Sequence, residues 1–425
     1  MTNAEKLSTL FLFIGVLHTF LAPYFAKLSK KFHQGSATEA FLHLLSEVEV
    51  VFGFWAFVFL STWALFDGLD KVIQYQQSLQ MIEPLFIFCI MIVASSKPIV
   101  ELSKTTLIYI SKSFTKLLPV DEILIQVFIV LGLGPLLGSF ITEPAAMTIL
   151  ALLLFQMLRQ SEELVLYGVL GLLFVNISIG GGLTHFAAPP ILIVAHKFGW
   201  GFQDVFLNIG EAVLSAVTLN VLVFVLCFKN KIKKNMQILR LDQQQNIPIW
   251  IILSHVIFLI AIVMSAHYEK VFFGLFLIFI GLADVTKKYQ DRLKFREAFL
   301  VAFFLGGLIV FGSLQKWWLT PVLNSLADKS LYFVATVLTA VTDNAALTFL
   351  GSQVDGLTES SKWALVSGAI TGGGLTILAN APNPAGFAIL SPKFKNGSLN
   401  AAKLFLAALG PTVITVVCFF LMGRF

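Results

Sequence analysis

The sequence predicts an all-α polytopic membrane protein, built as an inverted-topology repeat with two re-entrant hairpins and two broken transmembrane helices. Three observations support this prediction: the apolar composition, the distribution of basic residues, and two polar motifs that recur in the second half. Of the 425 residues, 57% are hydrophobic and only 12% are charged, whereas a soluble domain is about one-quarter charged. A soluble globular enzyme is therefore excluded, and the high hydrophobicity excludes a disordered chain.

The apolar runs define the spans. They are continuous, which favours helices over the alternating strands of a β-barrel, and a spanning helix needs about 20 apolar residues. Uninterrupted spans are predicted at 7–25, 49–66, 85–97, 203–228, 248–267, 270–286, 297–314 and 400–423. Two further stretches, 121–158 and 328–358, contain a polar tip. They are predicted to be hairpins whose arms are each too short to cross a membrane alone.

The basic residues orient these spans. The net charge is +5, and membrane proteins keep Lys and Arg in cytoplasmic loops, so the charge indicates sidedness and not nucleic-acid binding. With the basic clusters inside, the first hairpin enters from the cytoplasm and the second from the opposite face. The charged, Gln-rich segment 229–247 is then a cytoplasmic linker between a first repeat, 1–228, and a second repeat, 248–425.

Two polar motifs recur in the same order in the two halves. TEPAAMT at 142–148 matches TDNAALT at 342–348, and GGGLT at 180–184 matches GGGLT at 372–376. Each glycine run interrupts an apolar stretch, 163–197 or 362–391, which we predict to be a broken helix. Because the two halves begin on opposite sides, the repeat is inverted in topology. Secondary transporters have this architecture, and their discontinuous helices meet at a midplane site.

Four stretches give the chain a wider resemblance. TEPAAMTILALLL, NISIGGGLTHFAAPP, TDNAALTFLGSQV and ITGGGLTILANAPNPAG resemble a bacterial family of putative sodium/proton antiporters. That family belongs to the ion transporter superfamily, which also contains arsenite efflux pumps and dicarboxylate or citrate carriers. The resemblance covers nearly the whole chain and implies a multi-pass homodimer of the inner membrane, with a scaffold and a transport domain. It places the ion site at the tips, 142–146 and 342–346, and at the breaks near Gly180 and Gly372.

Two acids at matching repeat positions, Glu143 and Asp343, are the main candidates for chemistry. An ionisable residue at membrane depth is costly and indicates function. A carboxylate binds either a proton or a hard cation such as sodium, which prefers oxygen ligands. One site that holds the two in turn is the minimal antiporter. The structural alternative is that one acid only caps the N-terminus of a broken helix.

Neutral oxygens beside the two acids are candidates to complete a cation shell. They are Thr142, Thr342, Asn344, Asn380, Asn383, Asn176, Ser178, Thr184 and Thr376, with Thr148 and Thr348 as weaker candidates. The helix breaks add backbone groups, because Gly permits close approach; these are Gly180, Gly181, Gly182, Gly372, Gly373 and Gly374. Glu211 and His185 are candidates for a proton relay, since histidine titrates near neutrality.

The predicted function is secondary active cation/proton antiport, with sodium (or lithium) exchanged for protons by alternating access and no cofactor. The first alternative is an anion carrier for dicarboxylate or arsenite, coupled to sodium or to protons. The resembling dicarboxylate branch carries Ser-Asn-Thr at both tips, whereas this chain carries Thr-Glu-Pro and Thr-Asp-Asn. The second alternative is an intramembrane aspartyl protease that uses Asp343, although its usual Gly-x-Gly-Asp context is absent.

Overall fold

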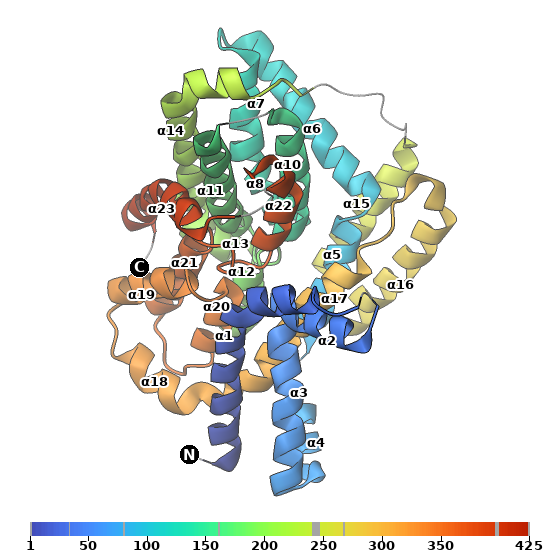
Figure 1. The fold of residues 1–425 in the computed structure, drawn as a ribbon, viewed down its shortest axis with the longest axis vertical. Coiled ribbons are helices and arrows are strands. Elements are labelled where there is room, and N and C mark those ends of the chain that lie inside the picture. The colour runs from blue at the N-terminus through green and yellow to red at the C-terminus, as the bar shows by residue number, and fades with distance from the viewer. Residues whose placement is uncertain are drawn as a thin grey trace. The chain divides into compact units, whose positions relative to one another are not determined.

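The computed structural model describes residues 2–33, 35–79, 81–159, 162–239, 247–266, 268–395 and 399–423. Within these ranges the regular elements are all helices (Figure 1), with a single isolated bridge between Leu158 and Met236. The predicted all-α class is confirmed. The chain forms two compact units: one contains 1–89, 295–325 and 349–356, and the other contains 90–294, 326–348 and 357–425.

Six helical stretches in the described part of the chain are long and apolar enough to cross a membrane, which confirms a polytopic membrane protein. They are Val50–Asp67, Glu122–Ile141, Glu163–Leu183, Phe202–Asn235, Phe295–Asn324 and Ala401–Met422. Leu69–Ser78 and Ile82–Ala94, bent by 60°, give a seventh if they count as one span. Fewer stretches pass this test than were predicted as spans, because elements such as Ile249–Met264 have only 16 residues.

The first unit is a bundle of helices that come from separate segments of the sequence. Its elements are α1 (Asn3–Ser29), α2 (Ala37–Ser46), α3 (Val48–Asp67), α4 (Leu69–Ser78), the start of α5 (Ile82–Ala94), α17 (Phe295–Gly312), η5 (Ser313–Gln315) and α18 (Lys316–Asn324). Helices α3 and α17 touch at glycines: a Cβ on Gly307 would lie 2.4 Å from the backbone N of Gly53. Only hydrogen fits there, so the two backbones approach closely.

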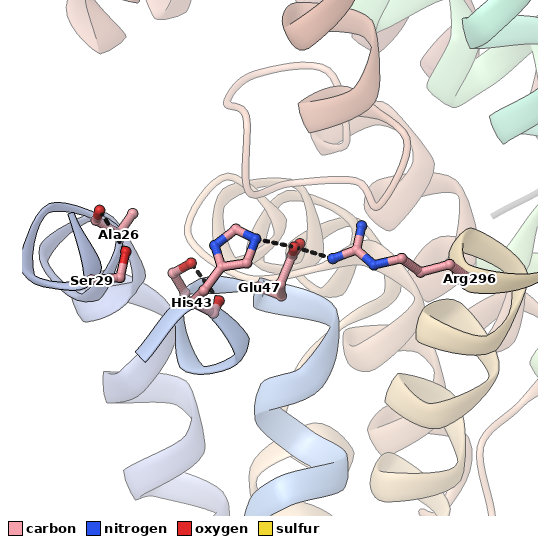
Figure 2. Close-up of polar contacts among 6 residues, drawn as sticks. Ala26, Ser29, His43, Glu47 and Arg296 are labelled. Atoms are coloured by element: carbon pink, nitrogen blue, oxygen red, sulfur yellow. Dashed lines mark hydrogen bonds and ion pairs between the residues drawn. The ribbon is translucent and has the colours of Figure 1, made fainter. Parts of the chain in front are cut away.

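One ion pair joins the starts of α3 and α17 in this unit. Figure 2 shows Arg296 Nη2, which donates to Glu47 Oε1 over 2.6 Å, and His43 Nε2, which lies 3.8 Å from the same oxygen. Glu47 is the residue before α3, and Arg296 lies in the first turn of α17. The pair therefore fixes the two helices at the same end.

The second unit holds the first predicted hairpin, the first arm and tip of the second, and both predicted helix breaks. Its elements are the rest of α5, α6 (Lys97–Leu117), α7 (Glu122–Phe128), η1 (Ile129–Leu133), α8 (Gly134–Leu136), α9 (Gly138–Ile141), α10 (Glu143–Met157), α11 (Glu163–Gly180), η2 (Gly181–Leu183), α12 (Pro189–Phe198), α13 (Phe202–Val205), η3 (Phe206–Gly210), α14 (Glu211–Asn235), α15 (Ile249–Met264), α16 (Glu269–Val285), η4 (Lys287–Tyr289), α19 (Asp328–Thr339), the start of α20 (Asn344–Ser352), α21 (Glu359–Gly372), α22 (Asn383–Leu390), η6 (Ser391–Lys393) and α23 (Ala401–Met422).

The first hairpin folds back at Thr142. A Cβ on Gly134 would lie 2.4 Å from the Leu150 side chain, and one on Gly138 would lie 3.6 Å from Ala146. Both pairs are symmetric about residue 142, so α10 packs antiparallel against α8 and α9. The prediction that each arm is too short to span was wrong for the first arm. Glu122–Ile141 has 20 residues, because the π-helical turn η1 continues the helix through its glycines.

Charged residues gather at the end of this unit where the first hairpin begins. Lys233 binds the exposed Asp121, and this hydrogen bond lowers the pKa of the Asp121 carboxyl. Lys231 and Lys234 both contact Glu162, at 3.5 and 3.1 Å. The predicted linker 229–247 therefore begins as helix: α14 continues to Asn235, and residues 240–246 lie outside the described ranges.

The two broken helices meet at their C-terminal ends. Ser178 Oγ near the end of α11 donates to the carbonyl of Ile370 in α21 over 2.7 Å. A Cβ on Gly374 would lie 2.3 Å from Val175 Cα. The partner residue number falls as the α11 number rises, so the helices are antiparallel and begin at opposite ends of the unit. In Figure 1, α11 and α21 accordingly extend in opposite directions from the centre of this unit.

Candidate functional site

Glu143 is the first residue of α10 and is completely buried. Its Oε2 accepts a hydrogen bond from Asn380 Nδ2 over 2.9 Å, whereas its Oε1 finds no hydrogen-bond partner among the described residues. The preceding Thr142 has a φ of +73°, an unusual value for a residue with a branched side chain. The backbone strain at this tip is a cost that is typical of functional sites.

Gly181 leaves room for this carboxyl group. A Cβ at this position would lie 2.5 Å from Glu143 Oε1 and 2.8 Å from Glu143 Cγ. A contact shorter than 3.0 Å forces atoms to shift. Glycine is therefore required at position 181, in the first glycine run, because a larger residue would occupy the space of the Glu143 carboxyl group.

Asp343 has a different environment. It is partly buried, and its Oδ1 accepts hydrogen bonds from the backbone N–H groups of Ala345 (2.8 Å) and Ala346 (3.1 Å). These bonds cap the first turn of α20, the structural role that the sequence left open for one of the acids. Of the two acids, only Glu143 is fully enclosed.

Three asparagine side chains lie near the acids and carry polar atoms that have no hydrogen-bond partner among the described residues. Asn344, Asn380 and Asn383 are 0–1% exposed. Asn383 Nδ2 donates to the carbonyls of Gly373 and Thr376, both over 2.8 Å. Each of the three amide oxygens lacks a hydrogen-bond partner in the described chain, and so does Asn344 Nδ2. Because buried polar groups are nearly always paired, this cluster has the property expected of a ligand site.

The cluster is continuous. The backbone N–H of Asn344 donates to the carbonyl of Ala379, next to Asn380, over 3.1 Å. A Cβ on Gly373 would lie 2.1 Å from Ser178 Oγ and 2.8 Å from Asn344 Nδ2. The second glycine run therefore lets the break, the second tip and the end of α11 converge.

Helix ends of both signs meet at the site, so the side chains decide which ion it prefers. Helices α11 and α21 finish here with a partial negative charge, whereas α10 and α20 begin here with a partial positive charge. Buried carboxylate, amide and hydroxyl oxygens are the ligands of hard cations. In the described residues, no group of three or more His, Cys, Asp or Glu side chains is arranged to hold a metal ion.

Most predicted hydroxyl ligands are already used by backbone carbonyls. Thr342 Oγ1 donates to Leu338, Thr184 Oγ1 to Ser139, and Thr376 Oγ1 to Ala340, over 2.7–2.8 Å. Thr148 and Thr348 bond to carbonyls in their own helices. Thr142 Oγ1 differs, because it is buried without a hydrogen-bond partner in the described structure.

The structure places Asn176 in a separate polar network, and not in the shell predicted for it. Asn176 Nδ2 donates to the carbonyl of Leu131 over 2.7 Å, and its Oδ1 accepts from Asn220 Nδ2 over 3.0 Å. Asn220 also donates to Thr415 Oγ1 over 3.1 Å. These bonds join α11, α14 and α23, so the amide connects helices.

The two candidate relay residues lie at the start of α14 and just after the first helix break. Glu211 is exposed at the beginning of α14. His185 is half-buried just after the first break, where its ring packs edge-on against Phe186 with centroids 5.4 Å apart.

Sequence reasoning missed two hydroxyl residues, Ser139 and Thr339. Both are completely buried. Ser139 Oγ donates to the carbonyl of Gly180 over 2.7 Å and accepts from the backbone of Leu183 over 2.9 Å, which holds the first break against the first tip. Each residue lies three positions before the tip threonine of its half, so the repeat itself was a usable signal.

The fold and this site define a polytopic secondary transporter with broken helices around buried acids, a protein class distinct from soluble enzymes. The sequence profile of the putative Na+/H+ antiporter family matches residues 3–422. The chain therefore belongs to that family, as the resemblance predicted. A search of curated proteins finds no match.

Replacing Gly181 by Ala tests the space beside Glu143. Its φ of −69° suits alanine, so the substitution acts mainly through the clash with the carboxyl group, the nearest of the atoms that a Cβ would meet. We expect cation/proton exchange to fall about tenfold, the effect of a displacement of about 1.4 kcal/mol, measured as proton flux in proteoliposomes. Gly410→Ala is the control, because a Cβ there meets nothing within 4 Å. Equal rates for the two variants would contradict this role.

Proposed function

We propose that the protein exchanges sodium, or lithium, for protons at a single buried site, by alternating access. The observation that supports this most directly is Glu143, a fully buried carboxyl with one oxygen unpaired in the described structure, surrounded by amide oxygens that are also unpaired. A protonated carboxyl is neutral, and an ionised one is balanced by a bound cation. Protonation of Glu143 therefore weakens cation binding at the site, and no cofactor is required.

The two halves of the site take unequal roles in this proposal. Asp343 lies beside Asn344, which has its amide oxygen available, and we assign the pair to the cation. Among the described residues, Glu143 is held by one hydrogen bond, from Asn380, and its other oxygen is unpaired, so we assign it to the proton. Ser178, Thr376, Thr342 and Thr184 then position the backbone around the ion and do not bind it directly.

The repeat and its inverted topology stay predictions, and packing at the glycine runs supports them. Gly180 packs on the carbonyl of Pro135, and Gly372 packs on the carbonyl of Thr336; a Cβ would lie 2.7 and 2.3 Å from these oxygens. In each half, the first glycine of a break thus rests on the first arm of a hairpin. The second unit contains all the site residues, and we assign it as the transport domain of a homodimer in the bacterial inner membrane, with the first unit as scaffold.

The chemistry of the site favours a cation over an anion. Neither Lys nor Arg is among the described residues of the buried cluster, and two acids would repel dicarboxylate or arsenite. A sodium-coupled anion carrier would require a further site. The test is proton flux in proteoliposomes, with sodium, lithium and potassium added in turn and citrate as the control substrate. Flux driven by citrate and by no cation would overturn the proposal.

Cysteine labelling tests the sidedness of the two hairpins. Asp121 lies with Lys233 at the basic end of the second unit, and Asp328 begins α19. We expect Asp121→Cys to react with an impermeant maleimide only from the cytoplasm, and Asp328→Cys only from outside. The measurement is labelling of intact cells against inverted vesicles. Labelling of both from one side would remove the inverted repeat.

A further inference from the structure

A row of hydroxyl groups lies in the seam between α19 and α21. On α19 the polar residues Asp328, Tyr332, Thr336 and Thr339 follow at steps of four, four and three residues, which places them on one face of the helix. Four of the seam side chains, including Thr339 and Tyr332, are completely buried. The chain is 57% hydrophobic, so a buried row made of polar residues is not what its composition would lead one to expect.

Hydrogen bonds show how the row crosses the seam. Ser361 Oγ donates to Asp328 Oδ1 over 2.5 Å at the outer end. Further in, Tyr332 OH and Thr371 Oγ1 lie 2.9 Å apart. The inner end is Thr339, whose Cβ would lie 2.8 Å from a Cβ on Gly372. The row therefore extends from the beginning of α19 to the glycine break, about 16 Å at 1.5 Å per residue.

Two hydroxyls in the row lack a hydrogen-bond partner within the described residues: Ser367 Oγ and Thr339 Oγ1. Both side chains are 0% exposed. A buried hydroxyl that bonds to its own helix is satisfied, as Thr336 is through the carbonyl of Tyr332. The two unsatisfied groups instead have free donor and acceptor capacity inside the seam, which suits water molecules between the hydroxyls.

The matching seam of the first half has fewer hydroxyls: Ser139 corresponds to Thr339, but the other positions of the row are apolar. The positions that correspond to Asp328, Tyr332 and Thr336 are Phe128, Gly132 and Leu136. On the facing helix, Ser361, Ser367 and Thr371 correspond to Val169, Val175 and Ile179. Close packing of the two helices requires only small residues at their interface, and it requires them equally in both halves. The hydroxyls are therefore not required by the packing that the two halves share.

We propose that this row conducts protons between the site and the side of the membrane where α19 and α21 begin. The inference rests on the proposed antiport. A proton from water near Asp328 adds to a hydroxyl or to an intervening water, which releases its own proton to the next group. One O–H bond forms and one breaks at each step, so each group is restored and a single proton reaches a site carboxylate. Thr339 is the last member, four residues before Asp343.

Thr371→Val tests the row. It removes a buried hydroxyl and keeps the shape of the side chain. Sodium/proton exchange in proteoliposomes should fall at least about tenfold, because a proton-transfer group is lost. Exchange of labelled sodium for unlabelled sodium needs no proton transfer and should keep its rate. Thr371→Ser should restore sodium/proton exchange, since it restores the hydroxyl.

Thr412→Val is the matched control. Thr412 is also buried, and its Oγ1 bonds to the carbonyl four residues earlier in its own helix, as Thr371 Oγ1 does. This variant should leave both exchanges unchanged. Loss of both exchanges in Thr371→Val, or an unchanged proton rate in the triple variant Thr339→Val, Ser367→Ala, Thr371→Val, would overturn the proton route. Absence of sodium/proton exchange in the unaltered protein would instead refute the antiport itself.

Discussion

Glu143→Gln should abolish sodium/proton exchange while sodium/sodium exchange continues. Glutamine keeps the size of the side chain and an oxygen for the bond from Asn380, but it does not titrate. Proton-coupled flux should fall at least about 100-fold, the lower end of what a positioned acid or base contributes. Sodium/sodium exchange should remain and lose its dependence on pH, because no proton then competes with the cation. Flux of both kinds is measured in proteoliposomes at several pH values.

Glu211→Gln is the matched control for this experiment. It makes the same chemical change at an exposed glutamate in the second unit. It should leave both exchanges and their pH dependence unaltered. A Glu143→Gln protein that shifts only the sodium half-saturation, with its pH profile intact, would show that Glu143 binds the cation and that the division of roles is wrong.

Asp343→Asn should abolish both sodium/proton and sodium/sodium exchange. Asparagine and aspartate cap helices about equally well, so the bonds to the backbone of Ala345 and Ala346 are retained and only the charge is lost. The free energy of unfolding should therefore change by less than about 1 kcal/mol. The measurements are both fluxes in proteoliposomes and the melting temperature in detergent.

Asp343→Ala separates the charge of this residue from its cap. Alanine removes both, and loss of a cap costs about 1 kcal/mol of stability. If Asp343→Asn transports normally and only Asp343→Ala is impaired, Asp343 acts as a cap alone. The cation would then be held by Glu143 and the neutral oxygens.

Much of the architecture can be predicted from local sequence patterns, which lie within a single helix or a single motif. Continuous apolar runs predicted the all-α membrane class, because a lipid environment demands internally paired backbone. The glycine runs predicted breaks, and α11 and α21 do end at Gly180 and Gly372. The length of the first arm was predicted wrongly, because the π-helical turn over Ile129–Leu133 continues the helix from Glu122 to Ile141.

Sequence patterns by themselves determined the membrane class and the family and predicted the two acids, because each depends on composition or on residues close together in the chain. Only the tertiary structure decided which candidates meet. It joined Glu143 to Asn380, 237 residues away, and placed Asn176 in a different network. It also showed that Asp343 spends one oxygen on a helix cap while Glu143 retains one unpaired. Hydrogen bonds between distant segments depend on how the broken helices pack, and no local pattern encodes that packing.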